Sequence, residues 1–318
     1  MSRGLGDVYK RQDYLGVVCK QFPRYSEYYG TIKESGIGLA CEEAARIILS
    51  ENRPFSMETA ACDEEYEPSS EYDSSFALQI FAAREAVFKI LAKESLSIHE
   101  KLIVILDMGS KIQQCINTDE YDNIKSVVND YLKEGIAHTL DETRNLSDSG
   151  QFEDISLQQG IRQILYPYEE MEVLNPEWEV ILKDIIDSLF EQMSDEEYNI
   201  LNEEFGTYMV SRAYEYRQLL EYLVFRYFAK SIYDYDFLGK CQMLVTNFFV
   251  IRQMDIIRWL DNHREYSFKD RMDVVHIFSR QVEYSEDNIE NLYEDFIFDD
   301  IFKTDSLIAI LWIDSENI

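Results

Sequence analysis

The sequence predicts an all-α protein, in which a multi-helix, bundle-like domain follows a small irregular N-terminal section. Only 12 glycines and 5 prolines occur among 318 residues, so turns are few and long helices are expected. From about residue 76 onward, apolar residues recur at helical spacing over most of the chain. No series of short alternating runs joined by hairpin turns is present, so a sheet-based core is not expected.

The composition indicates a folded, strongly acidic protein. Hydrophobic residues make up 46% of the chain and aromatic residues 14%, which excludes a disordered chain, and the formal net charge is −31. A polyanion of this size repels nucleic acid and anionic lipid and favours basic surfaces, including those of lysine-bearing proteins. A merely soluble acidic surface is the simpler explanation of the charge alone.

The sequence also bears on the cellular compartment. No stretch approaches the ~20 consecutive apolar residues that a membrane span needs. Arg3 is followed by no apolar region of the kind that signal peptides contain. The five cysteines are odd in number and scattered, which fits reduced thiols better than a disulfide framework. We therefore expect a cytoplasmic protein without a membrane span.

The chain divides into four regions. Residues 1–12, MSRGLGDVYKRQ, form a basic run that is either a natural leader or sequence foreign to this protein. Residues 13–61 are irregular, apart from a short helix expected over CEEAARIILSEN. The acidic stretch CDEEYEPSSEYDSS, residues 62–75, is the best candidate for a linker, and residues 76–318 form the helical domain.

The helical domain is expected to open with three helices. One face of the first is formed by Ile80, Ala83, Val87 and Leu91. The second begins at a capping box, in which Ser97 accepts a backbone hydrogen bond and Glu100 reaches back. The third covers residues 119–135 and is expected to stop at Gly135. Residues 139–154 are polar and are expected to form a loop.

The second half of the domain is expected to be helical throughout. Pro167 and Pro176 punctuate the chain before a helix over residues 176–193. Ser194 and Glu197 repeat the capping-box pattern. Further helices are expected over residues 214–228, 241–260 and 270–282.

Most motifs that carry chemistry are missing. Gly36-Ile37-Gly38 is a lone G-x-G and no dinucleotide-binding pattern follows it. The four histidines are far apart in sequence, so each is expected to be an ordinary surface or core residue. Carboxylates are too abundant for spacing to locate a paired-carboxylate site. The residues alone therefore assign no catalytic group.

The cysteines fall into two groups. Cys115 and Cys241 lie in helical apolar patterns and are expected to pack as small hydrophobes. Cys62 lies among carboxylates, which disfavour a thiolate. Cys19 and Cys41 lie in the irregular section, and Cys41 stands at a helix N-terminus, which favours the thiolate that soft metals bind. Two cysteines do not complete a four-ligand site, so metal ligation and a structural role are both open.

Three stretches resemble the flagellin lysine-N-methylase family. The family carries Cys-(Arg/Lys)-x-(Tyr/Phe)-Pro-Arg and then Ser/Ala-Cys-Pro-Glu-Ala-Ala-Arg, which here read CKQFPR, residues 19–24, and ACEEAAR, residues 40–46. Glu42 replaces the family's proline, and both residue types suit the first turn of a helix. FSRQVEYS, residues 278–285, is similar to the family's C-terminal Ser-Arg-x-x-Glu-(His/Tyr) stretch.

The resemblance implies a function and a set of residues. Family members methylate lysine side chains of flagellin with S-adenosylmethionine, and a Cys-rich N-terminal segment holds a metal centre, a 4Fe-4S cluster. By resemblance, Cys19 and Cys41 are two of the metal ligands. Five further residues belong to the family stretches, and ion pairing or helix capping is the simpler role for the charged ones: Pro23, Arg24, Arg46, Arg280 and Glu283.

One departure from the family concerns the start of the chain. Most of the family's other cysteines lie upstream of the first stretch, and this sequence has no cysteine before Cys19. Residues 1–12 look like translated adaptor sequence, so we expect Asp13 to be the first authentic residue of a truncated chain. Residues 13–61 are then the remnant of a Cys-rich cluster segment. We expect the chain as it stands to bind no intact cluster and to methylate poorly.

Two other functions are kept open. One is a non-catalytic acidic helical module that binds lysine-rich protein partners, and the other is a cysteine-cluster protein that handles electrons. Lysine methylation itself requires a neutral amine, so we expect acidic and tyrosine side chains to guide the cationic substrate and accept its proton. The site of the methyl donor is not assigned by any pattern.

Overall fold

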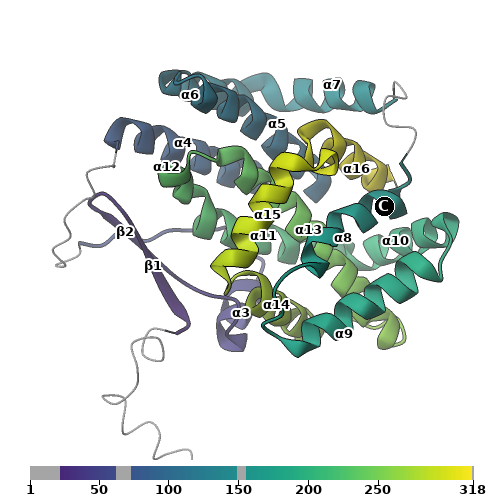
Figure 1. Cartoon of the computed structure of the whole chain (residues 1–318). Coiled ribbons are helices and arrows are strands. Elements are labelled where there is room, and N and C mark those ends of the chain that lie inside the picture. The colour runs from purple at the N-terminus through teal and green to yellow at the C-terminus, as the bar shows by residue number, and fades with distance from the viewer. Residues whose placement is uncertain (1–21, 62–72, 149–154, 317–318) are drawn as a thin grey trace, which may run out of the picture.

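The computed structural model describes residues 22–61, 73–148 and 155–316. It confirms the all-α prediction: within these residues a two-stranded hairpin is the only sheet, and helices form the rest of the regular structure. Figure 1 shows the hairpin at one side of the helical body, with the short helix α3, Glu42–Leu49, below it.

The hairpin corrects the expectation that the N-terminal section is irregular. Strand β1, Arg24–Tyr29, pairs antiparallel with β2, Ile32–Ile37, and Gly30 has a positive φ of 60° in the connecting turn. A positive φ is the conformation that glycine adopts without strain. An isolated two-stranded hairpin is only marginally stable in water, so this one depends on side-chain contacts with the helices.

Two contacts hold the hairpin against the helices. The buried Arg84 guanidinium donates to both carboxylate oxygens of Glu34, at 2.7 and 2.5 Å. The Tyr29 ring is also buried and packs edge-on against Phe81, with ring centroids 5.8 Å apart. Both partners lie on α4, Ser74–Leu91, so the hairpin is fixed to the first long helix.

The helices follow one another with short connections. After α3 they are α4, Ser74–Leu91; α5, Ile98–Asn117; α6, Ile124–Asp130; α7, Ile136–Asp148; α8, Leu157–Glu169; α9, Pro176–Ile185; α10, Asp195–Met209; α11, Ala213–Tyr227; α12, Ser231–Asp234; α13, Phe237–Asp261; α14, Phe268–Val282; α15, Glu286–Phe298; and α16, Thr304–Glu316. Both predicted capping boxes are present, at Ser97 and at Ser194. The expected helix over residues 176–193 is α9 followed by a π-helical segment, Ile186–Glu191.

Helix α13 lies at the centre of the molecule. It is buried on nearly all sides, and α5, α8, α9, α11 and α14 pack around it (Figure 1). A helix that is buried on all its faces is typical of such a central position, and α13 also buries polar side chains, among them Asn247, Arg252 and Asp255. The surrounding helices are amphipathic and turn one face toward α13.

Two predictions of where helices are interrupted are wrong. Gly135 does not end a helix, because a π-helical segment, Tyr131–Gly135, continues directly into α7. Helix α7 in turn occupies residues 139–148 of the expected polar loop. Tertiary contacts stabilise it: the indole of Trp312 on α16 donates to Thr143 Oγ1 at 3.1 Å, and Arg144 covers the same ring.

Two further boundaries differ from the sequence prediction. Pro167 lies inside α8, which continues to Glu169. Helix α4 begins at Ser74, within the expected 62–75 linker, because Asp73 caps it by accepting from Ser75 N and Phe76 N. The rest of the expected linker, residues 62–72, and the end of the expected loop, residues 149–154, lie outside the described residues.

Candidate functional site

A buried ion pair joins α11 to the end of α14. Arg226 Nε lies 3.1 Å from Glu283 Oε2, and Glu283 is 6% exposed. Two phenols donate to the same oxygen, Tyr222 at 2.7 Å and Tyr227 at 3.1 Å. Glu283 was singled out by the third family stretch, whereas Arg226 and the two tyrosines were not.

The site is also rich in aromatic rings. The Arg226 guanidinium lies 4.6 Å from the Tyr25 ring centroid, 5.5 Å from that of Tyr227 and 5.9 Å from that of Tyr284. Burial and then the charge of Glu283 raise the pKa of Tyr222 well above its ordinary value. The same two causes raise the pKa of Tyr227. These phenols therefore stay protonated at neutral pH and act as hydrogen-bond donors.

The N-terminal stretches reach this cluster through a close backbone approach. Gly38 N donates to the carbonyl of Pro23 at 2.8 Å, and the Phe22–Pro23 peptide bond is cis. A β-carbon on Gly38 would lie 3.2 Å from both Arg226 Nη1 and Tyr284 Oη. Only glycine leaves these side chains undisturbed there, so segments from both ends of the sequence meet at Arg226.

We name this group the motif cluster: Pro23, Tyr25, Gly38, Tyr222, Arg226, Tyr227, Glu283 and Tyr284. The remaining motif residues lie outside it. Arg24 is exposed on β1, and Arg46 is exposed on α3 and pairs with Glu43 at 2.6 Å. Arg280 is exposed on α14 and lines a separate cleft. For Arg46 the structure thus shows the simpler role, an ion pair within its own helix.

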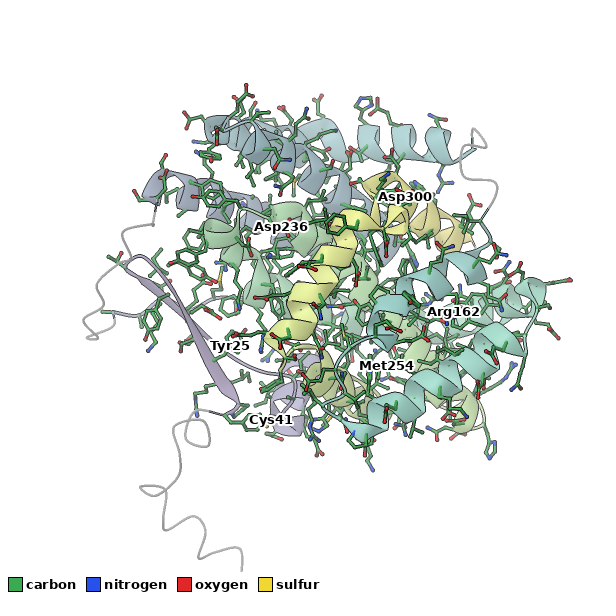
Figure 2. The ribbon with its side chains drawn as sticks, in the orientation of Figure 1. Tyr25, Cys41, Arg162, Asp236, Met254 and Asp300 are labelled. Carbon is green, nitrogen blue, oxygen red and sulfur yellow. The ribbon has the colours of Figure 1, made fainter. Side chains whose placement is uncertain are left out.

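Cys41 lies next to the motif cluster. It is half-buried and is the N-cap residue of α3, where its side chain makes no capping hydrogen bond. Figure 2 labels Cys41 at α3 and Tyr25 on β1. Tyr284 is close enough for the Cys41 sulfur to contribute to the raised pKa of that phenol, after burial and Glu283.

Of the two cysteines that the family resemblance makes metal ligands, Cys19 and Cys41, the structure describes Cys41. Cys19 and Cys62 lie outside the described residues. Cys241 is buried in α13 and Cys115 is half-buried in α5, so both pack as the sequence predicted. Within the described ranges, no three His, Cys, Asp or Glu side chains are grouped to hold a metal ion. An iron–sulfur cluster needs four ligands, so the described residues do not by themselves form a site for one.

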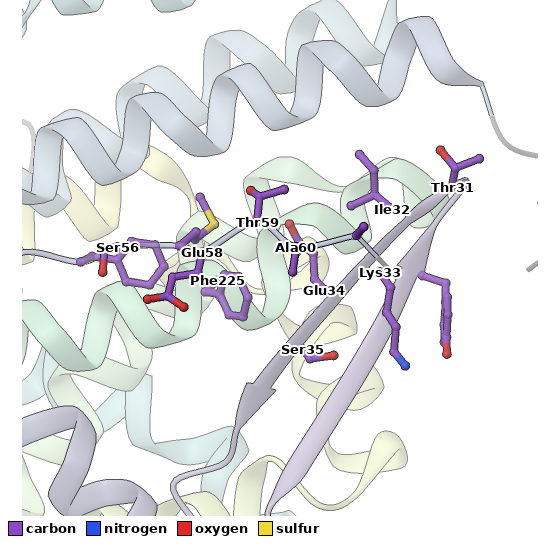
Figure 3. Close-up of a pocket in the computed structure, with 15 residues that line it drawn as sticks. Thr31, Ile32, Lys33, Glu34, Ser35, Ser56, Glu58, Thr59, Ala60 and Phe225 are labelled. Carbon is purple, nitrogen blue, oxygen red and sulfur yellow. The ribbon is translucent and has the colours of Figure 1, made fainter. Parts of the chain in front are cut away.

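Two hollows lie between the hairpin, α11 and the connecting segment 53–61. One measures about 660 Å³ and is lined mainly by β2 and residues 55–61, as Figure 3 shows. The other measures about 300 Å³ and lies beside Tyr25 and Tyr222. Both are lined by Phe55, Ser56 and Phe225, so they are neighbours, and we name them together the hairpin groove.

A third hollow, of about 570 Å³, lies among α9, α13, α14 and the first residue of α3. Its floor is apolar, formed by Met254, Ile257 and Ile277. Its rim carries two arginines and five carboxylates: Arg258, Arg280, Glu42, Glu177, Asp184, Asp261 and Asp273. We name it the Arg280 cleft. None of these carboxylates forms a side-chain ion pair with another residue in the part of the chain that the structure describes.

The residues that sequence reasoning missed follow a simple spacing. Gln218, Tyr222 and Arg226 are four residues apart on α11, so they lie along one face of that helix. Gln218 lines the hairpin groove, Tyr222 lines it and bonds to Glu283, and Arg226 completes the ion pair. Polar residues at i, i+4 and i+8 within the apolar run YEYRQLLEYLVFRYF were the available signal.

Comparison with known proteins gives this arrangement a context. Residues 84–310 match the family model of the FliB lysine N-methylase C-terminal domain. The match begins within α4 and ends within α16, so it covers most of the helical body. The match covers well over half of the chain, so the protein belongs to the FliB lysine N-methylase family. This confirms the family inferred from the three sequence stretches.

The other comparisons add no relatives. No curated protein and no solved structure matches the chain. Among the described residues, no helix has both the length and the apolar character to cross a membrane.

Proposed function

We propose that the protein methylates lysine side chains of flagellin with S-adenosylmethionine as the methyl donor. The observation that carries this proposal is the family match over residues 84–310. The motif cluster supports it, because Pro23, Gly38 and Glu283, far apart in sequence, converge on Arg226. Convergence of distant segments on one buried polar group is typical of functional sites.

The reaction sets requirements for the site. The lone pair of a neutral lysine amine attacks the methyl carbon of the sulfonium, so that a C–N bond forms and the C–S bond breaks. The donor leaves as a thioether, and the methylated amine releases its proton. The buried tyrosines of the motif cluster are unsuited to accept that proton, because their raised pKa keeps them protonated. A carboxylate or water is the acceptor that remains.

The Arg280 cleft supports a cationic protein substrate. An apolar floor can hold the aliphatic stem of a lysine while carboxylates at the rim attract its ammonium group. The rim carries five carboxylates against two arginines. The cleft includes Glu42, which follows Cys41, so a substrate bound there lies near the N-terminal segment.

We also propose that Cys41 is a ligand of a metal centre, a 4Fe-4S cluster, completed by cysteines outside the described residues. Its support is the family stretch and the position of Cys41 at a helix N-terminus, without a capping bond. When bound, such a cluster would supply a redox-active or Lewis-acidic iron beside the motif cluster.

The cluster proposal predicts a difference between two cysteines. In the protein encoded by the native gene, Cys41→Ser should lower iron content and the visible absorption band after anaerobic reconstitution with iron and sulfide. Cys115→Ser, a matched change of a half-buried thiol on α5, should leave both unchanged. Equal iron content in Cys41→Ser and wild type would contradict the assignment of Cys41.

Methyl transfer itself is tested with radiolabelled donor. The native gene product is incubated with purified flagellin and S-adenosylmethionine labelled in the methyl group, and label in flagellin is counted. We expect label to depend on both enzyme and flagellin. Binding of flagellin without any transfer would instead favour a non-catalytic acidic module that docks lysine-rich partners. Reversible one-electron reduction without transfer would favour an electron carrier.

A further inference from the structure

The end of α15 exposes two large apolar side chains. Ile297 is 74% exposed and Phe298 is 79% exposed, and no other large apolar side chain among the described residues is as exposed as either. Phe296, directly before them, is buried together with Leu292 on the inner face of the helix. A single exposed apolar residue is ordinary, but two adjacent ones give a protein partner an apolar surface to cover.

Carboxylates surround these two side chains: Glu294, Asp295, Asp299 and Asp300. Glu294 precedes Phe298 by four positions and Asp295 precedes it by three, so both lie on its side of the helix. Asp300, labelled in Figure 2, follows the end of α15 and pairs with Lys303 at 2.5 Å. The other three carboxylates form no ion pair with any residue that the structure describes.

The electrostatics of α15 disfavour carboxylates at this end. The C-terminal end of a helix carries a partial negative charge, which favours lysine or arginine there. The last turn of α15 contains no basic residue. Burial, and then the charges of Asp299 and Glu294, raise the pKa of Asp295, so the carboxylates repel one another. A cation supplied by another molecule would relieve both effects.

We propose that this surface docks a cationic segment of the protein substrate, flagellin, an inference that rests on the proposed function. We name it the α15 patch: Glu294, Asp295, Ile297, Phe298, Asp299 and Asp300. The segment that fits it has an apolar side chain beside lysine or arginine. The apolar side chain covers Ile297 and Phe298, while the cation meets the carboxylates and the end of the helix.

Other occupants fit the α15 patch less well. A second copy of this chain carries the same net charge of −31, so long-range repulsion opposes self-association through an acidic surface. An anionic lipid surface is repelled for the same reason. A neutral bilayer offers no cation to the carboxylates. A lysine-bearing protein complements both parts of the patch.

The α15 patch lies away from the Arg280 cleft. Helix α15 begins shortly after Arg280 and rises from the end of α14 toward α16, so the patch is at its far end (Figure 1). Its 13 residues span about 20 Å at ~1.5 Å per residue. A whole flagellin molecule can therefore contact both surfaces at once, and two linked contacts bind more tightly than either alone.

The test is binding of flagellin to the full chain by biolayer interferometry, without methyl donor. Ile297→Ser/Phe298→Ser removes the apolar surface and should weaken binding about tenfold, as expected for the loss of a central apolar contact. Leu78→Ser, the same kind of change at a 67% exposed position of α4, should leave binding unchanged. Equal binding by the wild type and the Ile297/Phe298 variant would overturn the proposal.

A second pair of variants tests the carboxylates. Glu294→Gln/Asp299→Asn should weaken flagellin binding severalfold at 50 mM salt and less at 500 mM salt, because ions screen exposed charges. Asp141→Asn/Glu203→Gln removes two exposed carboxylates from α7 and α10 and should have a smaller effect. Equal effects of the two pairs would show that net charge alone, and not the patch, attracts flagellin. Circular dichroism and thermal unfolding must show that every variant is folded.

The outcomes separate this inference from the proposed function. Weaker flagellin binding by the patch variants, in a wild-type protein that transfers no label, would support docking and contradict methyl transfer. Transfer by the wild type with patch variants that bind normally would do the reverse. Absence of flagellin binding by the wild type would overturn docking. A dimer that Ile297→Ser/Phe298→Ser dissociates in analytical ultracentrifugation would assign the patch to a second copy instead.

Discussion

Glu283 illustrates how one side chain can hold distant parts of this chain together. Its Oε2 atom accepts hydrogen bonds from the phenols of Tyr222 and Tyr227 and forms the ion pair with Arg226. Its Oε1 atom is buried and has no hydrogen-bond partner among the described residues. Although burial opposes its charge, the Glu283 carboxylate and the nearby tyrosines raise the pKa of Arg226. Arg226 is therefore charged, and it depends on the carboxyl group of Glu283 for compensation.

Removal of the Glu283 carboxylate should destabilise the fold strongly. Glu283→Leu leaves the guanidinium of Arg226 uncompensated in a mostly buried position, so the free energy of unfolding should fall by about 3–5 kcal/mol. Urea unfolding measures the change. Arg280→Leu, three residues earlier and exposed, should change it by less than ~0.5 kcal/mol. Equal effects of the two substitutions would contradict the structural role of Glu283.

A second residue, Asp314, gives the stability a defined pH dependence. Burial favours the neutral form of Asp314. Its Oδ2 atom lies 3.6 Å from Arg252 Nη1 and 2.6 Å from His99 Nε2, and these two groups outweigh burial, so the pKa of Asp314 is lowered from 3.8 to about 2. The unfolded chain thus binds this proton at a pH where the folded protein does not. The resulting stabilisation, about 2 kcal/mol, is present above pH 3.8 and is lost as the pH falls toward 2.

The matching prediction compares two aspartates. Between pH 6 and pH 2.5, Asp314→Asn should lose less stability than the wild type, because the titrating group is absent. Asp300→Asn, at an exposed carboxylate, should follow the wild-type curve. Free energies of unfolding from urea titrations at each pH measure the difference. Parallel curves for Asp314→Asn and wild type would show that Asp314 does not contribute this dependence.

At the scale of elements, the packing of α5 on α13 depends on one small residue. A β-carbon on Gly109 would lie 2.5 Å from Cys241 Sγ and 3.2 Å from Cys241 Cβ. The helices therefore approach too closely for any side chain at Gly109. This also explains why Cys241 behaves as a packing residue, as its helical pattern predicted.

Gly109→Ala should destabilise the protein by about 1–3 kcal/mol through overpacking. Combining it with Cys241→Ala removes the clashing sulfur, so the double variant should lose less stability than the sum of the single changes. Gly109→Ala with Cys115→Ala, the other helical cysteine, should be additive. Thermal unfolding measures the stability of each variant. If the losses of stability are additive in both double variants, the β-carbon at position 109 does not clash with Cys241.

The elements that sequence reasoning predicted correctly are those set by local patterns. The capping boxes at Ser97 and Ser194 involve residues three positions apart, so the sequence alone reveals them. The hairpin was missed because its anchor, Glu34 with Arg84, joins residues far apart. Helix α7 was missed for the same reason, since its polar sequence is held by Trp312 on α16.

The residues of the candidate site also fall into those that the sequence predicted and those that it did not. Pro23, Cys41 and Glu283 were visible because they belong to stretches that resemble a known family. Arg226 and Gln218 were not, because they lie in an apolar helical run that reads as ordinary core. Their roles depend on what packs against α11, namely the hairpin and the end of α14.

At the scale of the whole molecule, α11 connects the N-terminal hairpin to the end of α14. On one face of α11, Gln218 lines the hairpin groove and Arg226 forms an ion pair with Glu283. The Arg280 cleft opens on the other side of α3. The net charge of −31 favours approach of a lysine-rich protein to such a surface. In this account the acidic surface attracts the protein substrate, and the Arg280 cleft receives its lysine side chain.

The most direct test of the central claim follows the methyl carbon. The native gene product is incubated with flagellin and S-adenosylmethionine carrying a carbon-13 methyl group, and flagellin peptides are sequenced by mass spectrometry. The account predicts heavy methyl groups on lysine ε-nitrogens, and none without enzyme. Unmodified lysines after incubation with folded, donor-binding protein, or heavy methyl groups confined to other residue types, would contradict it.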